Sequence, residues 1–373
     1  MRAVTDLISF VPPARRELSD ASLQRADWTN AGFRDSRLLW LDRNENTDPI
    51  LQAVVFRVLA EMNPRTVAIY PDAAPLYHKL ADYLGVSSQS LVLASGSDGI
   101  IGSMFRAFVE PGDAVLLTYP TYAMYQVYCR MHGARTSRLE YAASKAGPFL
   151  QLETVTATIR EQRPKLICLP NPDSPTGTVF DPDAMRSIIR CALETGSMIL
   201  VDEAYYPFYA NTAAPRVAEF PNLVVARTFS KAWGLAGVRL GYGITTPAIA
   251  DLLQKVRPNY EVNMVAVAMA LRMISDFDHE MRASVERLNR GRDGFLSSMK
   301  SLGLRTLASH GNFCHVAFGP WADRVHATLG EIAIYRRDSE APCLKGFSRF
   351  SSTTAELFRP VIERVRNVVL GSK

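Results

Sequence analysis

The sequence has few cysteines and no long hydrophobic run. Its five cysteines are scattered, and no two of them have the spacing of a metal site. An odd, unpatterned set argues against a disulfide framework and favours a reducing compartment. The apolar run at residues 7–11 stops at a Pro-Pro pair, too short for a signal-peptide core, and no later segment approaches a membrane span. We therefore expect a soluble, cytoplasmic protein with no metal site.

The charge is nearly balanced and is not concentrated anywhere. The chain carries 42 Lys and Arg against 37 Asp and Glu, a net charge of +5, without a basic run. A nucleic-acid partner is therefore not expected. A nicotinamide-binding enzyme is also disfavoured, because no G-x-G-x-x-G follows a strand candidate.

The length of 373 residues suits a large domain with a smaller companion. Short apolar runs alternate with helical patterns in the middle of the chain, which predicts a largely parallel sheet with helices on both faces. The strand candidates are residues 91–94, 114–117, 166–169, 198–201 and 223–226. The clearest helix covers residues 181–196, where Asp181 can cap the start and Gly196 can end it. From about residue 260 the pattern indicates a separate α+β unit.

Polar and aromatic residues follow each strand candidate. Because ligands gather at the carboxyl ends of parallel strands, we expect these groups to meet at one edge of the sheet. In chain order they are Gly96-Ser97-Asp98, Tyr119 to Tyr122, Asn171 to Gly177, Asp202 to Tyr205, and Thr228 to Lys231.

A lysine in such a cleft can form a Schiff base with a carbonyl, and pyridoxal phosphate (PLP) is the commonest cofactor bound that way. Lys231 is the candidate. Asp202 can keep the pyridine nitrogen protonated, Tyr205 can donate to the phenolic oxygen, and Tyr122 can stack on the ring. The expected phosphate cradle consists of Ser97 and Asp98 at a helix start, with Thr228, Ser230 and Arg239. Taken alone, each of these residues is more often a cap, a turn residue, a solvated side chain or ordinary packing, and only their joint occurrence in order favours a cofactor site.

These motifs make the sequence resemble a class I/II aminotransferase of fold type I, most similar to the histidinol-phosphate aminotransferase family. The resemblance spans roughly residues 40 to 355. It rests on LDRNEN (41–46), YPD (70–72), GSDGII (96–101), YPTYAMY (119–125), NPDSPTGT (171–178), VDEAYYPF (201–208), TFSKAWGLAGVRLGYG (228–243), VRPNYEVN (256–263), GNF (311–313) and FSRFS (347–351). The spacing of eight between Lys231 and Arg239 is its most specific part.

The resemblance implies a seven-stranded, mostly parallel sheet in a large domain, residues 51–258, and a smaller α+β domain, residues 259–373, which residues 1–50 join. It makes Lys231 the Schiff-base lysine and proton shuttle, and it gives Asp202, Tyr205, Tyr122 and the cradle residues the cofactor roles described above. Arg349 matches the arginine that binds the anionic group of the substrate, and Asn44 and Arg337 are further substrate-side positions. Tyr70 matches a tyrosine that reaches the phosphate from the other subunit, which implies a homodimer.

The sequence departs from the family at three places. Ser174 stands where an Asn usually donates to the phenolic oxygen, so either water mediates that bond or Asn171 substitutes for it, and we expect an altered pKa of the lysine–cofactor linkage. Thr47 replaces a proline after NEN, and Arg336-Arg337 stand where the family has one arginine. All three changes touch the substrate side.

The predicted function is transfer of an amino group between an amino acid or amine and a 2-oxo acid. The donor class includes histidinol phosphate and aromatic or modified amino acids. One alternative keeps the fold and breaks another bond, as in a threonine-phosphate-type decarboxylase or a cyclase. A PLP-binding regulator is a further alternative, disfavoured because the residues before Asp42 show no helix-turn-helix pattern.

Overall fold

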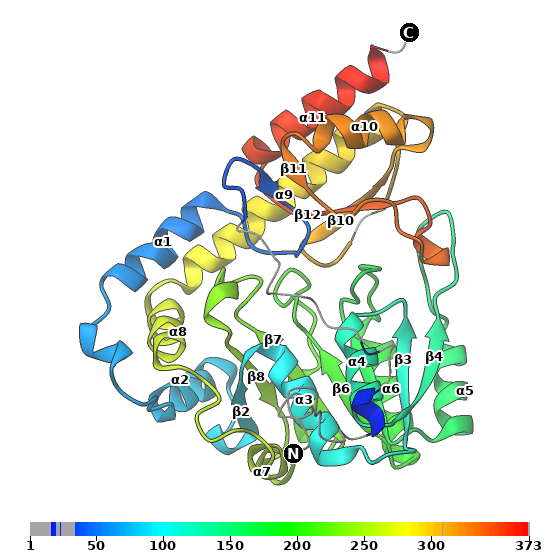
Figure 1. The fold of residues 1–373 in the computed structure, drawn as a ribbon. Helices are drawn as coiled ribbons and strands as arrows, with labels where there is room; N and C mark the ends of the chain where they lie inside the picture. The colour runs from blue at the N-terminus through cyan, green and yellow to red at the C-terminus, as the bar shows by residue number, and fades with distance from the viewer. Residues whose placement is uncertain (1–15, 20–22, 24–33, 308, 372–373) are drawn as a thin grey trace, which may run out of the picture.

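The computed structural model describes residues 16–19, 23, 34–307 and 309–371. The run at residues 7–11 and most of the expected N-terminal segment lie outside these residues. Within them, a seven-stranded sheet has the order β2-β8-β7-β6-β5-β3-β4 (Figure 1). Its strands are β2 (Leu91–Ala94), β3 (Ala114–Tyr119), β4 (Arg135–Glu140), β5 (Leu166–Pro170), β6 (Met198–Asp202), β7 (Leu223–Thr228) and β8 (Gly241–Ile244).

The sheet is mostly parallel, as the sequence predicts. Strand β8 alone runs antiparallel, to β2 on one side and β7 on the other, so β2 and β7 point the same way. The remaining pairs are parallel. The carboxyl ends of β2, β3, β5, β6 and β7 therefore meet at one edge, where the polar residues that follow them come together.

Helices cover both faces of this sheet, which confirms the expected α/β class. One apolar cluster packs α1 (Pro49–Ala60), α2 (Ala74–Leu84), α5 (Leu152–Gln162), α6 (Pro182–Glu194) and α8 (Met264–Asp276) against one face. A second packs α3 (Gly96–Phe108), α4 (Ala123–Met131) and α7 (Pro247–Lys255) against the other. Helix α6 is the helix expected at 181–196, and the Asp181 carboxylate accepts from the backbone N–H groups of Asp183 and Ala184.

A smaller unit has its own antiparallel sheet, in the order β12-β10-β9. Its elements are β9 (Arg305–Leu307), β10 (Phe313–Ala317), β12 (Ser348–Ser351), α10 (Ala322–Leu329), α11 (Ala355–Leu370) and the second half of α9 (Asp278–Ser301). In its core the Phe295 ring stacks on Phe358 and lies tilted against Phe350. Strand β1 (Leu39–Trp40) pairs with β11 (Ala333–Ile334), and Leu41 joins the same core. Short 3₁₀ turns occupy Arg16–Ser19, Pro64–Val67, Ser88–Ser90, Ala214–Ala218, Ala236–Val238, Gly319–Trp321 and Pro342–Leu344.

Helix α9 runs from one unit into the other (Figure 1). Met281 and Val285, in its first half, pack with α8 in the core of the large unit, whereas Phe295 and Met299 pack in the small one. We therefore propose a domain boundary within α9, later in the chain than the expected division at 258/259. Among the described residues, no helix is long and apolar enough to cross a membrane.

Candidate functional site

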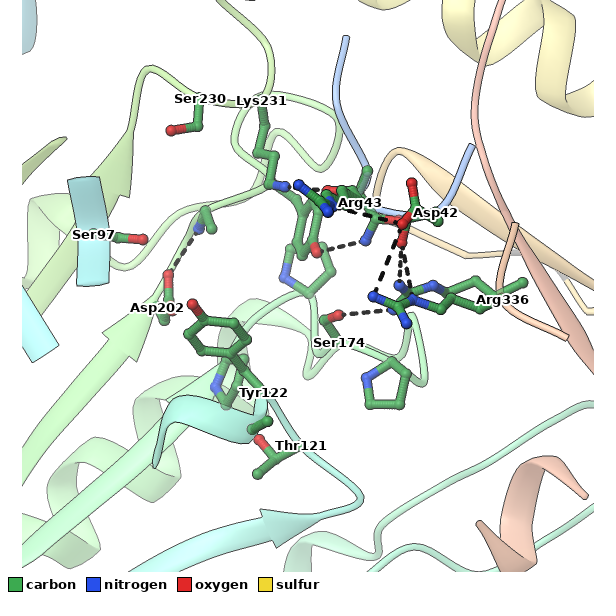
Figure 2. Close-up of a pocket in the computed structure, with 18 of the residues that line it drawn as sticks. Asp42, Arg43, Ser97, Thr121, Tyr122, Ser174, Asp202, Ser230, Lys231 and Arg336 are labelled. Carbon is green, nitrogen blue, oxygen red and sulfur yellow. Dashed lines mark hydrogen bonds and ion pairs between the residues drawn. The ribbon is translucent and has the colours of Figure 1, made fainter. Parts of the chain in front are cut away.

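A cavity of about 720 Å³ opens at the carboxyl edge of the large sheet, between the two units (Figure 2). It contains nearly all of the residues that the sequence singles out. Those at its wall are Asn44, Ser97, Asp98, Tyr122, Ser174, Asp202, Tyr205, Thr228, Ser230, Lys231, Arg239, Arg337 and Arg349. The grouping follows from the shared direction of five strands, since each of these strands delivers its following loop to the same edge.

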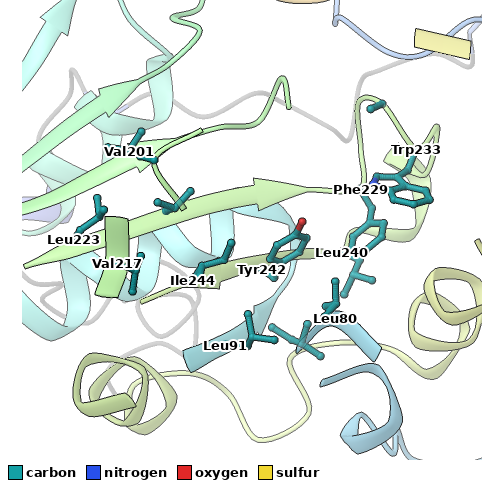
Figure 3. Packing of buried hydrophobic residues seen from close by; sticks show 14 of the residues in the cluster. Leu80, Leu91, Val201, Val217, Leu223, Phe229, Trp233, Leu240, Tyr242 and Ile244 are labelled. Atoms are coloured by element: carbon teal, nitrogen blue, oxygen red, sulfur yellow. The ribbon is translucent and has the colours of Figure 1, made fainter. Parts of the chain in front are cut away.

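Lys231 reaches into the cavity from the loop after β7. Its Nζ donates to the backbone carbonyl of Arg43 over 2.7 Å. Burial, reinforced by the positive charge of Arg349, lowers the pKa of Lys231 to about 8. The flanking rings of Phe229 and Trp233 lie 5.5 Å apart in the apolar core (Figure 3), so the backbone that carries the lysine is held in place.

Asp202 ends β6 and is buried at the base of the cavity. Its Oδ2 accepts from the Tyr125 hydroxyl at 2.9 Å, and its Oδ1 accepts from the backbone N–H of Ala204 at 3.0 Å. Burial raises the pKa of Asp202 to about 6, and these two hydrogen bonds oppose the rise. The carboxylate is therefore mostly ionised at neutral pH.

Tyr125 is a member of this site that the sequence reasoning missed. Its side chain is fully buried, and it lies one helical turn beyond Tyr122, with the two rings edge to face at 5.9 Å. The signal was present in YPTYAMY, where Tyr122 is the N-cap residue of α4 and Tyr125 follows in its first turn. Tyr122 itself points into the cavity near Asp202 (Figure 2).

The start of α3 forms an anion cradle with the loop after β7. Ser95 gives this helix no side-chain cap, so the first-turn N–H groups and Ser97 face the cavity at the positive end of the helix. Arg239 Nη1 donates to Ser230 Oγ at 3.1 Å, and Thr228 Oγ1 donates to the same oxygen at 2.9 Å. Two carboxylates also lie at this helix start: Asp98 is in its first turn, and Glu261 interacts with the backbone of Ser95.

Two glycines make the cradle sterically possible. A Cβ on Gly96 would lie 2.7 Å from Arg239 Nη2. A Cβ on Gly241 would lie 2.3 Å from the carbonyl carbon of Gly96 and 2.5 Å from the backbone nitrogen of Ser97. Strand β8 can therefore touch the start of α3 only because it has no side chain at this point.

Tyr205 faces the cavity beside the substrate-side residues. Its hydroxyl accepts from Asn44 Nδ2 at 2.9 Å. Burial raises the pKa of Tyr205, while Arg349, Ser174 and Asn44 oppose this rise. The structure thus places the Asn44 amide on Tyr205, a positioning contact that its expected substrate-side role did not include.

Arg349, on β12 of the small unit, lines the cavity. Its Nη2 donates to the backbone carbonyl of Asp42 at 3.0 Å, and its Nη1 lies 3.5 Å from Ser174 Oγ. Arg337 lies at the cavity wall, where its Nη2 donates to the backbone carbonyl of His326 at 3.4 Å. Arg336, its neighbour in the sequence, turns toward Asp42 (Figure 2).

Two expected site residues are not brought to the cavity. The Asn171 side chain is bound at both ends to the backbone of Phe180, with Oδ1 accepting at 2.9 Å and Nδ2 donating at 3.3 Å, so it braces the turn and does not replace the missing amide at Ser174. Tyr70 stacks on Tyr260 with ring centroids 4.6 Å apart and is 77% exposed. It cannot serve the cavity of its own chain from that position.

The residues present fit PLP. The cradle offers N–H groups, hydroxyls and a guanidinium to a phosphate, and a buried carboxylate faces a lysine whose pKa is lowered. No group of three or more His, Cys, Asp or Glu in the described part of the chain could hold a metal ion.

Comparison with known proteins places the chain in a family. Residues 36–365 match the model of aminotransferase class I and II, so the chain belongs to that family. It is 31% identical to a histidinol-phosphate aminotransferase of Caldanaerobacter subterraneus over 334 residues, covering 88% of this chain and 92% of the relative. A histidinol-phosphate aminotransferase of Dehalococcoides mccartyi strain CBDB1 is 34% identical over 319 residues, covering 84% and 86%.

A solved structure has the same fold. Histidinol-phosphate aminotransferase from Sinorhizobium meliloti, in complex with pyridoxal-5'-phosphate, aligns with a TM-score of 0.77 and 26% identity. The alignment covers 90% of this chain and 92% of that one. The expected family and fold are therefore confirmed.

Proposed function

We propose that this protein is a PLP-dependent aminotransferase that moves an amino group from an anionic amino donor to a 2-oxo acid. The observation that carries this proposal is the pairing of Lys231 and Asp202 in one cavity, with the anion cradle beside them. The curated relatives are histidinol-phosphate aminotransferases, which supports a donor with an anionic group.

PLP, when bound, supplies a carbonyl that condenses with an amine and a protonated ring that accepts electron density from the substrate Cα. Lys231 is suited to hold that carbonyl and to move the proton, because a pKa of about 8 leaves a useful fraction of the amine unprotonated near neutral pH. Asp202 is suited to hold the ring nitrogen in its protonated form, since it is mostly ionised at pH 7. The Arg349 guanidinium can bind the anionic group of the donor.

We also propose a homodimer, in which Tyr70 serves the site of the other subunit. Its exposure and its distance from the cavity of its own chain support this role. All five cysteines are buried and unpaired, which supports the expected cytoplasmic compartment.

The test is a panel of amino donors mixed with the purified holoenzyme, histidinol phosphate included. We expect at least one donor to convert the visible absorbance of the lysine-bound cofactor to that of the pyridoxamine form, and a 2-oxo acid to reverse the change. Lys231→Ala is expected to lose the lysine-bound band. A normal band in that variant, or release of carbon dioxide without consumption of a 2-oxo acid, would contradict the proposal.

A further inference from the structure

Three side chains form a row across the strands of the small unit. In the register of β10 and β12, His315 lies opposite Arg349. An isolated antiparallel bridge places Arg336 opposite Arg349 on its other side. Directly opposed residues project to the same face of a sheet, with Cβ atoms about 5 Å apart. The row His315–Arg349–Arg336 therefore lies on one face, and all three side chains line the cavity.

Alternation along the strands explains which face this is. Cys314, Val316 and Phe350 point the other way, into the core of the small unit. On the cavity face Phe313 precedes the row, with its ring 5.3 Å from that of Tyr205. The row is thus a continuation of the wall that carries Tyr205.

His315 is an unusual occupant of this wall. Its side chain is 1% exposed, and apart from a contact with the Pro175 backbone neither ring nitrogen has a hydrogen bond of good geometry among the described residues. Burial and the charge of Arg349 lower the pKa of His315 to about 3, an effect that an interaction with the backbone of Pro175 opposes. The imidazole is therefore neutral, with one N–H to donate. A buried polar group with no partner costs free energy, which a ligand in the cavity can recover.

The guanidinium groups of the row also retain unused donors. Arg349 Nε is buried and has no partner among the described residues. Arg336 is held only loosely, by the Asp42 carbonyl at 3.4 Å and the Asp42 carboxylate at 3.9 Å. The row thus combines two cations with one neutral N–H, a donor set that suits an anion with several oxygens.

We propose that His315 is a specificity-determining residue that donates a hydrogen bond to an oxygen of the substrate's anionic side-chain group, while Arg349 and Arg336 bind its charge. The group is a phosphate monoester or a carboxylate. This inference rests on the proposed function, because it assigns the substrate side of the same cavity.

The test uses holoenzyme and two matched donor pairs, histidinol phosphate with histidinol and glutamate with glutamine. His315→Leu is expected to lower kcat/KM about tenfold for the member of a pair that carries the anionic side-chain group and to leave the other member within about twofold, as loss of one hydrogen bond predicts. His315→Asn keeps a donor and should recover part of the loss. A loss confined to the histidinol phosphate pair identifies the bound group as a phosphate, and a loss confined to the glutamate pair identifies it as a carboxylate. His310→Leu is the control, since His310 is exposed and lines a separate pocket outside this cavity.

A binding measurement separates the inference from the proposed function. Inorganic phosphate and succinate serve as probes of the holoenzyme, where the cofactor fills the cradle. His315→Leu should weaken one of them about tenfold, and Arg336→Gln should weaken the same probe. If no donor reacts with the wild type, the proposed function fails while this binding difference remains measurable. Equal losses for both members of each pair, or unchanged binding of both probes, would overturn the inference.

Discussion

Asp202 owes part of its charge to Tyr125, a residue to which the sequence analysis gave no role. The Tyr125 hydroxyl donates to its carboxylate, and this hydrogen bond opposes the rise in pKa that burial causes. The ionisation of Asp202 at neutral pH therefore depends in part on Tyr125.

Tyr125→Phe removes that donor. We expect the Asp202 pKa to rise above about 6, so the acidic limb of the pH profile of kcat/KM moves to higher pH and activity at pH 7 falls roughly fivefold to tenfold. The profile measured between pH 5 and pH 9 checks this. Tyr209→Phe, at a tyrosine that bonds the Phe180 carbonyl outside the cavity, is the control. An unmoved acidic limb would show that Tyr125 does not tune Asp202.

Asp173 is a second buried carboxyl, next to Ser174. Thr118 and Tyr141 donate to its Oδ2 at 2.7 and 2.9 Å, yet burial raises its pKa to about 7. The unfolded chain ionises this group near pH 4, so its ionisation destabilises the fold progressively as the pH rises from about 4 to about 7.

Asp173→Asn removes the ionisable group and with it the loss of stability on ionisation. The amide oxygen of the new side chain can still accept from Thr118 and Tyr141. We expect the variant to gain stability over the wild type by roughly 2 to 4 kcal/mol at pH 8, and by much less at pH 4.5. Melting temperatures of the variant and the wild type at pH 8 and pH 4.5 test whether the variant gains more stability at the higher pH. A difference that does not change with pH would rule out Asp173 as its source.

At the scale of elements, the contact between β8 and the start of α3 determines the cradle. Gly241 of β8 pairs with Ala94 and Thr228, the last residues of its two neighbouring strands. The antiparallel strand therefore brings the end of β2 and the end of β7 to either side of one backbone, and with them both halves of the cradle.

Gly241→Ala should force these elements apart, because the new Cβ would overlap the backbone of Gly96 and Ser97. We expect PLP affinity to fall at least about tenfold and the melting temperature to drop, since a rigid backbone cannot give way as a flexible side chain can. Equilibrium dialysis against PLP measures the first effect. Gly237→Ala is the matched control, because a Cβ there meets no atom within 4 Å. Equal affinities in the two variants would refute the steric explanation.

The strands differ in how readily the sequence reveals them. Strands β2, β5, β6 and β7 are continuous apolar runs because both of their faces are covered. Strand β4 at the sheet edge is mostly exposed and reads as a polar segment, and β8 is half glycine. Neither was predicted, because neither carries the periodic apolar signal that burial produces.

At the scale of the whole molecule, the stretch that carries Tyr70 exposes many large hydrophobic side chains. Large hydrophobic side chains are exposed on α1 and the loop after it, and on the segment before α8. They are Ile50 (53%), Phe56 (70%), Leu59 (44%), Val67 (77%), Ile69 (49%), Tyr70 (77%) and Tyr260 (56%). Exposed apolar residues in this number along one stretch of chain favour a protein–protein interface.

A mixed dimer tests the proposed sharing of Tyr70. Tyr70→Ala and Lys231→Ala each remove one contribution, so either homodimer should have low activity. Co-expression should restore one complete site per mixed dimer, built from Lys231 of one subunit and Tyr70 of the other. We expect activity of mixed dimers, isolated by two affinity tags, of about half that of the wild type. Activity no higher than that of the homodimers would contradict a shared site.

The sequence by itself determined the α/β class, the family and the residues that meet at the carboxyl edge of the sheet. It could do so because strand burial, turn residues and the Lys231–Arg239 spacing are local patterns. Only the tertiary structure decided the partners of those residues: Tyr125 on Asp202, 77 positions away, Asn44 on Tyr205, 161 positions away, and His315 beside Arg349. Such pairs depend on strand order and register across the whole fold, which bring distant residues together without leaving a periodic trace in the sequence.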